Sequence, residues 1–244
     1  MTAVVIGGSS GLGRALCEEL AAQGCETIVI VASREDDCRR LADHLYLLHG
    51  VNALPFALDA REPADFRDRL LQGVADVGPI TQLFLPMGVA FDADRIGGAG
   101  DRLRDIWKVN YTAVVLSIEA LLPQMVSSGG RIAGFGSIAA IRTRNGNVQY
   151  AAAKAALTAY FASLRHSLVT APSVAQFYVV GYVDSGQSFG RTQLFPPLPA
   201  RQAARRILHD GATDFGKRYL PSYWAVIALV LRLLPWRIFS RLGF

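Results

Sequence analysis

Short apolar runs alternate with longer stretches of mixed polarity through the first 185 residues of the chain. The runs are rich in β-branched and aliphatic residues, which is typical of strands buried on both faces of a sheet. The intervals between them are helical in pattern. This alternation predicts strands at 2–6, 27–32, 51–58, 80–85, 131–136 and 174–180, and helices at 14–23, 36–49, 63–74, 103–126 and 149–168.

Strands that alternate with helices of this length predict an α/β fold, a Rossmann-type doubly wound parallel sheet in three layers. A chain of 244 residues with 51% hydrophobic and 18% charged residues suits one such globular domain. We assign residues 1–220 to this domain, with a last strand at 217–220. Residues 221–244 are expected to form a C-terminal apolar helical extension.

A glycine-rich turn follows the first strand and opens the first helix, with its glycines spaced G-x-x-x-G-x-G. Strand, glycine-rich turn and helix form the layout of a dinucleotide site. Glycine lets the backbone approach a pyrophosphate, and the helix N-terminus offers free N–H groups. We therefore expect the cofactor to contact Gly7, Ser9, Ser10, Gly11, Leu12 and Gly13.

The end of the second strand indicates which cofactor is bound. An NAD site usually has an acidic residue here for the adenosine ribose, but this chain has Ser33 and Arg34. A guanidinium suits a 2′-phosphate, so the sequence favours NADP(H) over NAD(H), with Arg14 as a further candidate. The alternative is that Arg34 is a solvated loop residue. Asp59 and Ala60 close the third strand, where the carboxylate can reach the adenine amino group.

A serine, a tyrosine and a lysine stand at a chemically useful spacing. Ser137 follows the fifth strand, and Tyr150 and Lys154 lie at i and i+4 on one face of the next helix. An ammonium lowers the pKa of a nearby phenol, normally about 10, so that the tyrosine can transfer a proton near pH 7. The serine hydroxyl can hold the same carbonyl oxygen. Alone, the three also fit an alanine-rich core helix with a buried tyrosine.

Together these pieces resemble the short-chain dehydrogenase/reductase family over roughly residues 2–185. The glycine-rich turn, Asp59, Asn110, Ser137, Tyr150 and Lys154 follow its order and spacing. The resemblance implies that Tyr150 is the acid/base, that Ser137 orients the substrate carbonyl, and that Lys154 lowers the tyrosine pKa and binds the nicotinamide ribose. It implies that Asn110 holds a water in the proton relay. Asparagine is unfavourable inside the predicted helix 103–126, so Asn110 is expected there for its hydrogen bonds.

The same resemblance adds Gly88, Val183 and Ser185 to the cofactor site, the last two near the nicotinamide carboxamide. Three positions depart from the family pattern. Residues 85–88 read Leu-Pro-Met-Gly where the family usually has Asn-Asn-Ala-Gly, which bears on local stability and cofactor packing. Val180 stands in place of a proline, and Ser185 in place of a threonine. The loop up to Pro199 is long enough to be a substrate lid.

The net charge of +5 is concentrated near the C-terminus. Residues 191–244 hold nine Lys/Arg against two Asp/Glu, whereas residues 1–190 hold sixteen against eighteen. Arginines interrupt the apolar run 222–244, which predicts one or two amphipathic helices. These helices fit packing on the domain or across a dimer, and they fit peripheral membrane contact with a basic flank. A similar tail occurs in a branch that resembles decaprenylphosphoryl-2-keto-ribose reductases, which act on a lipid-linked sugar.

The sequence therefore predicts an NADP(H)-dependent oxidoreductase that reduces a ketone to a secondary alcohol, or the reverse, by hydride transfer. Its expected substrate is a small-molecule or lipid-linked carbonyl or alcohol. The family implies a homodimer or homotetramer. No recognised nucleic-acid motif accompanies the basic charge, so nucleic acid is not an expected partner. The alternatives are a non-catalytic NADP(H)-binding protein and a membrane-peripheral scaffold protein. The complete Asn–Ser–Tyr–Lys set argues against the first, and only the tail supports the second.

The cysteines bear on the compartment. Cys17, Cys25 and Cys38 are odd in number and lack metal-ligand spacing, which indicates reduced thiols in a cytoplasmic protein and no metal site. The sequence predicts no secretory signal and no stretch long enough to span a membrane. The expected location is cytoplasmic, with membrane association through the tail as the open alternative.

Overall fold

One parallel sheet organises the chain, in strand order β3-β2-β1-β4-β5-β6-β7. The computed structural model describes residues 1–62, 64–98, 100, 102–184 and 195–241. Neighbouring strands pair in parallel throughout this sheet, which confirms the predicted doubly wound fold. The strands are β1 (Thr2–Ile6), β2 (Thr27–Ala32), β3 (Asn52–Ala57), β4 (Ile80–Leu85), β5 (Arg131–Ser137), β6 (Val174–Val180) and β7 (Lys217–Leu220).

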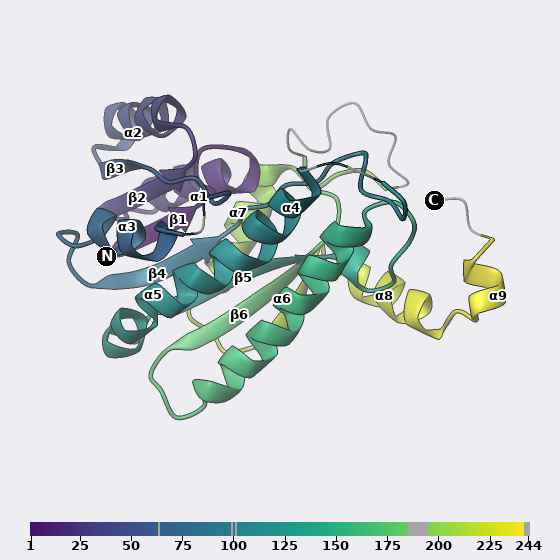
Figure 1. Cartoon of the computed structure of the whole chain (residues 1–244). Helices are drawn as coiled ribbons and strands as arrows, with labels where there is room; N and C mark the ends of the chain where they lie inside the picture. Colours follow the sequence, from purple (N-terminus) through teal and green to yellow (C-terminus); the bar gives the residue numbers. More distant parts are fainter. Residues whose placement is uncertain (63, 99, 101, 185–194, 242–244) are drawn as a thin grey trace.

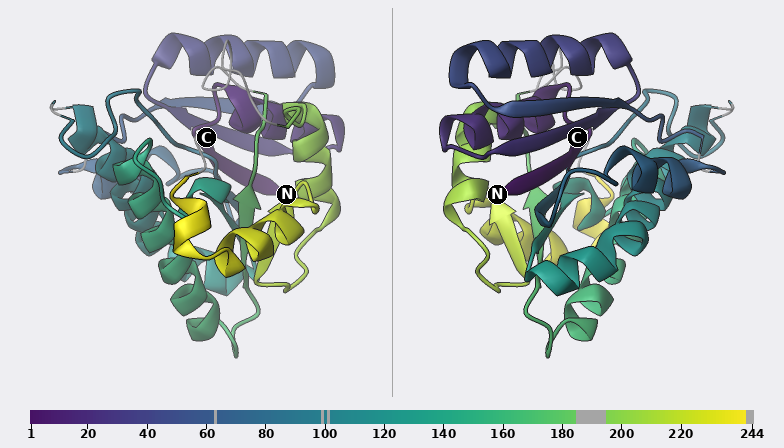
Figure 2. Two further views of the ribbon diagram at one scale, coloured as in Figure 1. Left: turned by 90° about the vertical axis from the view of Figure 1, so that its right-hand side faces the viewer. Right: turned by 90° about the vertical axis from the view of Figure 1, so that its left-hand side faces the viewer.

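Helices cover both faces of the sheet (Figures 1 and 2). One core lies between the sheet and α3, α5 and α6, and the other between the sheet and α1, α2 and α7. Side chains of β1 alternate between the two cores, as the pleat requires, with Val4 in the first and Val5 in the second. The helices are α1 (Gly11–Ala22), α2 (Glu35–His49), α3 (Phe66–Gly73), α4 (Arg102–Trp107), α5 (Ala113–Ser128), α6 (Val148–Ser167), α7 (Ala200–His209), α8 (Trp224–Leu233) and α9 (Trp236–Phe239).

The helical stretch predicted at 103–126 is confirmed, but it is not a uniform α-helix. A π-helical turn at Lys108–Thr112 separates α4 from α5. Asn110 lies in this turn, and its side-chain amide donates to the carbonyl of Ile106 at 2.9 Å. A side chain that bonds the backbone of the preceding turn competes with regular helical geometry. The locally unfavourable asparagine therefore marks the place where the helix deviates.

Helix α7 has no counterpart among the predicted helices. Four of its ten residues are buried, and it packs beside α1. Arg201 and Arg205 reach across to Glu19, whose carboxylate is buried between them, at 2.5 and 3.1 Å. These two guanidinium groups offset the burial of Glu19 and keep the pKa of its carboxyl below the usual range. The contact joins residues 182 positions apart, which local periodicity does not reveal.

The stretch Arg102–Ser128 is long and apolar enough, by length and composition alone, to cross a membrane. This differs from the sequence-based expectation that no such stretch exists. Half of its apolar 18-residue segment is buried in the structure. Its residues contribute to the core beside α3 and α6, so packing against the sheet accounts for their apolar character.

The tail forms the two short helices α8 and α9, which lie beyond the N-terminal end of α6 in Figure 1. Trp224 and Ala228 pack in a small buried cluster with Ile138 of the domain, and Phe239 is also buried. A boundary at residue 220 stays a prediction.

Glycine at position 134 is required by the packing of β5 on α6. A Cβ there would lie 2.2 Å from the ring of Phe161, which is itself 3% exposed. We expect Gly134→Ala to lower the free energy of unfolding by about 1–3 kcal/mol, through overpacking. Urea unfolding measures this, and Phe161→Leu should restore part of the loss in the double variant. Gly146→Ala, where nothing lies within 4 Å of the added carbon, is the matched control. Equal effects at both positions would contradict the packing argument.

Candidate active site

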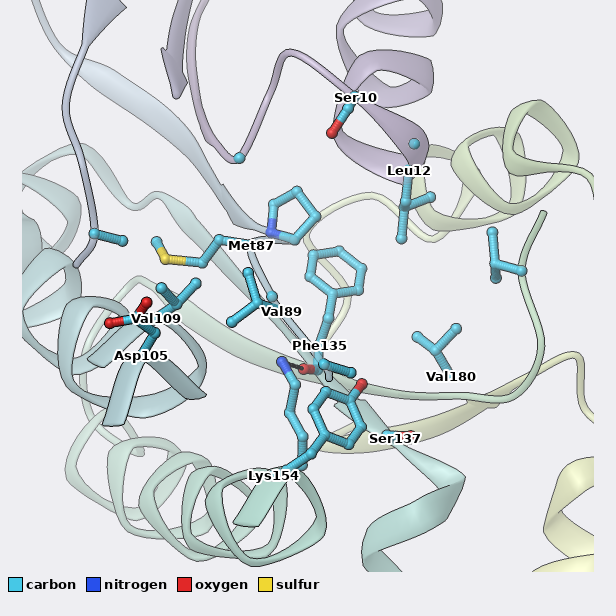
Figure 3. A pocket seen from close by; sticks show the side chains of 18 of the residues that line it. Ser10, Leu12, Met87, Val89, Asp105, Val109, Phe135, Ser137, Lys154 and Val180 are labelled. Atoms are coloured by element: carbon cyan, nitrogen blue, oxygen red, sulfur yellow. Dashed lines mark hydrogen bonds between the residues drawn. The ribbon is translucent and has the colours of Figure 1, made fainter. Parts of the chain in front are cut away.

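A cavity of about 820 Å³ lies at the carboxyl ends of the strands (Figure 3). It includes the point between β1 and β4 where the strand order reverses, which is where doubly wound sheets bind ligands. Most of the predicted site residues line it, namely Gly7, Ser9, Ser10, Gly11, Leu12, Ser33, Asp59, Ala60, Gly88, Ser137, Tyr150, Lys154 and Val183. Gly13, Arg34 and Asn110 adjoin this lining, and Ser185 lies outside the described residues.

The glycine-rich turn is folded so tightly that side chains would block it. A Cβ on Gly13 would stand 2.0 Å from the carbonyl oxygen of Gly7, and one on Gly7 would stand 2.8 Å from the backbone of Met87. Ser10 precedes α1 in an extended conformation and, within the described structure, its side chain does not cap the helix. The first N–H groups of α1 are thus not taken by that side chain, and they suit a pyrophosphate.

The wall formed by the ends of β2 and β3 carries two arginines. Arg34 is 77% exposed on its side chain and pairs with Asp37, while its neighbour Ser33 lines the cavity. Arg61 also lines the cavity, and its guanidinium holds Asp59 with a closest contact of 2.6 Å. This pairing keeps the pKa of the Asp59 carboxyl below its usual range. Arg61 was missed in the sequence, although a basic residue two positions after the strand-ending aspartate was a visible signal.

Asn110 braces the segment that follows β4. Its side chain is fully buried and donates to the carbonyl of Val89 at 2.8 Å, and it accepts from the N–H of Val89 at 3.3 Å. Gly88 passes so close that a Cβ there would lie 2.9 Å from the amide oxygen of Asn110. The expected hydrogen-bonding role of Asn110 is therefore present next to residues 85–88. A water relay through Asn110 stays a prediction.

Ser137 and Lys154 lie at the floor of the cavity (Figure 3), and Tyr150 lines the cavity with them. Lys154 is 3% exposed, and its ammonium donates to the carbonyl of Phe135 at 3.0 Å and lies 5.9 Å from the ring centre of Tyr150. Burial lowers the pKa of Lys154 to about 8. Burial also raises the pKa of Tyr150, and a hydrogen bond with Ser137 opposes that rise. In the protein by itself, desolvation thus outweighs the lowering expected from the lysine.

A buried carboxylate that was missed in the sequence positions Tyr150. Asp94, in the loop before α4, is 1% exposed and accepts from the N–H groups of Gln149 at 2.7 Å and Tyr150 at 2.9 Å. Its carbonyl accepts from the N–H of Asn147, at 2.7 Å, just before α6. A carboxylate is favourable at a helix N-terminus, so Asp94 fixes the start of the helix that carries the tyrosine. The contact spans 56 positions, and no local pattern indicates it.

The cavity is also lined by five residues that the sequence did not single out, namely Phe91, Arg102, Arg144, Asn147 and Tyr182. The guanidinium of Arg102 lies over the ring of Phe91, 4.6 Å from its centre. Val183 is held by a bridge to Leu198. The predicted lid falls largely on residues 185–194, which lie outside the described residues.

Comparison of the sequence with known proteins gives consistent results. The short chain dehydrogenase family model matches residues 1–185. A short chain dehydrogenase of Pseudocercospora fijiensis is 33% identical over 174 residues, which is 68% of this chain and 54% of that protein. The 3-oxoacyl-[acyl-carrier-protein] reductase FabG of Escherichia coli is 27% identical over 75% of this chain and 73% of its own length. The chain thus spans about half the length of the fungal relative.

Solved structures share the fold. An alcohol dehydrogenase from Thermococcus sibiricus, complexed with 5-hydroxy-NADP, superposes with a TM-score of 0.80 at 18% identity, covering 89% of this chain and 94% of that one. A short chain dehydrogenase from Burkholderia cenocepacia, in complex with NADP, gives 0.79 at 23% identity, covering 88% and 93%. The family match over the sheet and the cavity, together with this fold, leads to one conclusion: the chain belongs to the short-chain dehydrogenase/reductase family of oxidoreductases.

Proposed function

We propose that this protein is an NADP(H)-dependent oxidoreductase that reduces a ketone to a secondary alcohol, or catalyses the reverse reaction. The observation that carries the proposal is one continuous cavity with the glycine-rich turn in its lining and Ser137, Tyr150 and Lys154 at its floor. A dinucleotide on the turn would extend along this lining. Holding two reactants side by side removes much of the entropic barrier to their reaction.

In this proposal Tyr150 moves the proton and Ser137 holds the carbonyl oxygen. Both side chains line the cavity, and an oxygen placed between them would accept from both hydroxyls. The buried ammonium of Lys154 is close to the Tyr150 ring and would also contact the nicotinamide ribose. The cofactor, when bound, supplies or accepts the hydride. Asn110 would hold a water in the proton relay.

The adenosine end of the site favours a 2′-phosphate. Ser33 lines the cavity and Arg34 follows it, so the guanidinium would exchange Asp37 for the phosphate. Arg61 adds a second guanidinium to the same wall, and Asp59 and Ala60 lie where the adenine would rest. Two of the structural relatives hold NADP or 5-hydroxy-NADP, which supports this preference. Gly88, Val183 and Ser185 are proposed contacts of the nicotinamide end.

The proposed substrate is a small-molecule or lipid-linked carbonyl or alcohol. The proposed assembly is a homodimer or homotetramer, and the proposed location is the cytoplasm. Peripheral membrane contact through 222–244 is the further part of this proposal, because the tail exposes apolar side chains. A binding protein without turnover is the competing function. It leaves the shared position of Ser137, Tyr150 and Lys154 without a purpose.

Tyr150→Phe should lower kcat by roughly 10²–10⁴-fold, the usual contribution of general acid–base catalysis, while the affinity for NADPH changes little. Steady-state turnover of a ketone and titration by nicotinamide fluorescence measure the two quantities. Tyr160→Phe is the control on the same helix, because the Tyr160 hydroxyl donates to Glu119 rather than facing the cavity. Near-full activity of Tyr150→Phe would exclude Tyr150 as the acid/base.

Arg34→Asp should shift the ratio of NADPH to NADH affinity toward NADH by roughly 10- to 100-fold, since a charge-assisted contact is lost and a repulsive one is introduced. Parallel fluorescence titrations with the two cofactors measure this ratio. Arg39→Asp is the matched control, because Arg39 pairs with Glu35 on the same helix. An unchanged ratio for Arg34→Asp would direct attention to Arg61.

Burial of Lys154 predicts a pH-dependent stability. Its pKa is about 8 in the folded protein against a reference of 10.5, so between these values the unfolded state binds more protons. The cost of burying the ammonium is fully present below pH 8 and is relieved as the pH rises to 10.5. The unfolding free energy of the wild type, minus that of Lys154→Met, should therefore rise by about 3 kcal/mol across this window. Urea unfolding of both proteins tests this, and a constant difference would contradict it.

A further inference from the structure

Helix α8 is apolar on both of its faces, and only one of them is covered. Trp224 and Ala228 point into the domain and are 4% and 1% exposed. The opposite side carries large apolar side chains that are 51–73% exposed, at helical spacing and continuing into α9. This outer face of the tail consists of Val226, Leu229, Val230, Leu233, Trp236 and Ile238. A helix that is apolar all round is normally buried, so this face calls for a partner.

The charge around the outer face is of one sign. Arg232, Arg237 and Arg241 are exposed, and the sequence from 221 to 244 contains no Asp or Glu. A second copy docked face to face would bring six arginines together without acidic residues from either tail. An anionic lipid surface, by contrast, attracts each basic residue and takes up apolar side chains.

The length of α8 agrees with a surface position. Ten residues of helix extend about 15 Å, which is half of what a bilayer core requires. A short helix with an apolar face, flanking arginines and an exposed tryptophan suits the membrane interface, lying in its plane.

We infer that the outer face of the tail docks on an anionic lipid bilayer surface. Arg142, which lies in the segment between Ser137 and α6, holds the tail in place. The Arg142 guanidinium donates to the carbonyls of Leu231 and Leu234 at the end of α8, the first at 2.6 Å. It also lies 4.2 Å from the ring centre of Phe239 in α9. One cation therefore closes the C-terminus of α8 and fastens α9.

The inner side of the same tail backs the cavity. The Trp224 indole lies so close to Gly181 that a Cβ there would approach it to 1.9 Å, and it meets the ring of Tyr182 edge-on at 5.4 Å. Gly181, Tyr182 and Ile138 all line the cavity. A docked tail would thus hold this wall of the cavity next to the lipid surface. That consequence for substrate access rests on the proposed oxidoreductase activity. The docking itself deepens the proposed membrane contact and does not depend on that activity.

The test is sedimentation of the full chain with vesicles of phosphatidylcholine alone and of phosphatidylcholine mixed with phosphatidylglycerol. The wild type should pellet with the mixed vesicles, and added salt should weaken this binding. The double variant Leu229→Glu with Leu233→Glu should bind at least about tenfold more weakly. Arg232→Gln with Arg237→Gln should lose roughly tenfold or more on the mixed vesicles only. Leu47→Glu, at an 80% exposed apolar residue of α2, is the matched control and should bind as the wild type does.

Two further measurements separate the outcomes. NADPH titration of each variant shows whether the domain is intact, so failure of docking and failure of the proposed function are distinguishable. Sedimentation velocity without vesicles shows whether the glutamate substitutions dissociate an oligomer. Three results would overturn the inference: a wild type that stays in the supernatant with both vesicles, equal loss in Leu47→Glu, or an oligomer that the glutamates dissociate.

Discussion

The buried hydrogen bond from the Lys154 ammonium to the carbonyl of Phe135 is the contact on which the site depends. It ties α6 to the end of β5, and it brings the cation under the cavity instead of leaving it in solvent. Burying an ammonium is costly, and the carbonyl provides only part of the compensation, as the depressed pKa of Lys154 indicates. The pKa of an ammonium held in this way changes when an anionic or polar group enters beside it.

The other parts of the site converge on that contact from different directions. The Asp94 carboxylate accepts from the N–H of Tyr150 and so fixes the first turn of α6, which carries this tyrosine. Asn110 fixes the segment after β4 through its bond to Val89, and its second bond, to Ile106, lies in the π-helical turn. Residues 85–88 lack the asparagines that are usual in the family. The side-chain hydrogen bonds of Asn110 brace the backbone next to them.

The tail changes how the domain ends. Arg142 connects α8 and α9 to the same segment that leads from Ser137 to α6, and Trp224 supports the adjacent wall through Gly181. The extension is therefore joined to the cavity and is not an appendage on the far side of the sheet. Its outer face is the large apolar surface that folding leaves uncovered in this part of the described chain.

The sequence by itself determined the order of the strands and helices up to residue 180. It also singled out the glycine-rich turn, Ser137, Tyr150 and Lys154, which the tertiary structure brings into the lining of one cavity. Buried strands, tight turns and i, i+4 pairs are local patterns, and a parallel α/β chain has few ways to assemble them. It did not predict α7, the π-helical turn at Asn110 or the residues that position the site. Asp94, Arg142 and the pairing of Glu19 with α7 were decided by tertiary structure alone. Their side-chain contacts join residues 55 to 186 positions apart, and local periodicity does not indicate contacts over such separations.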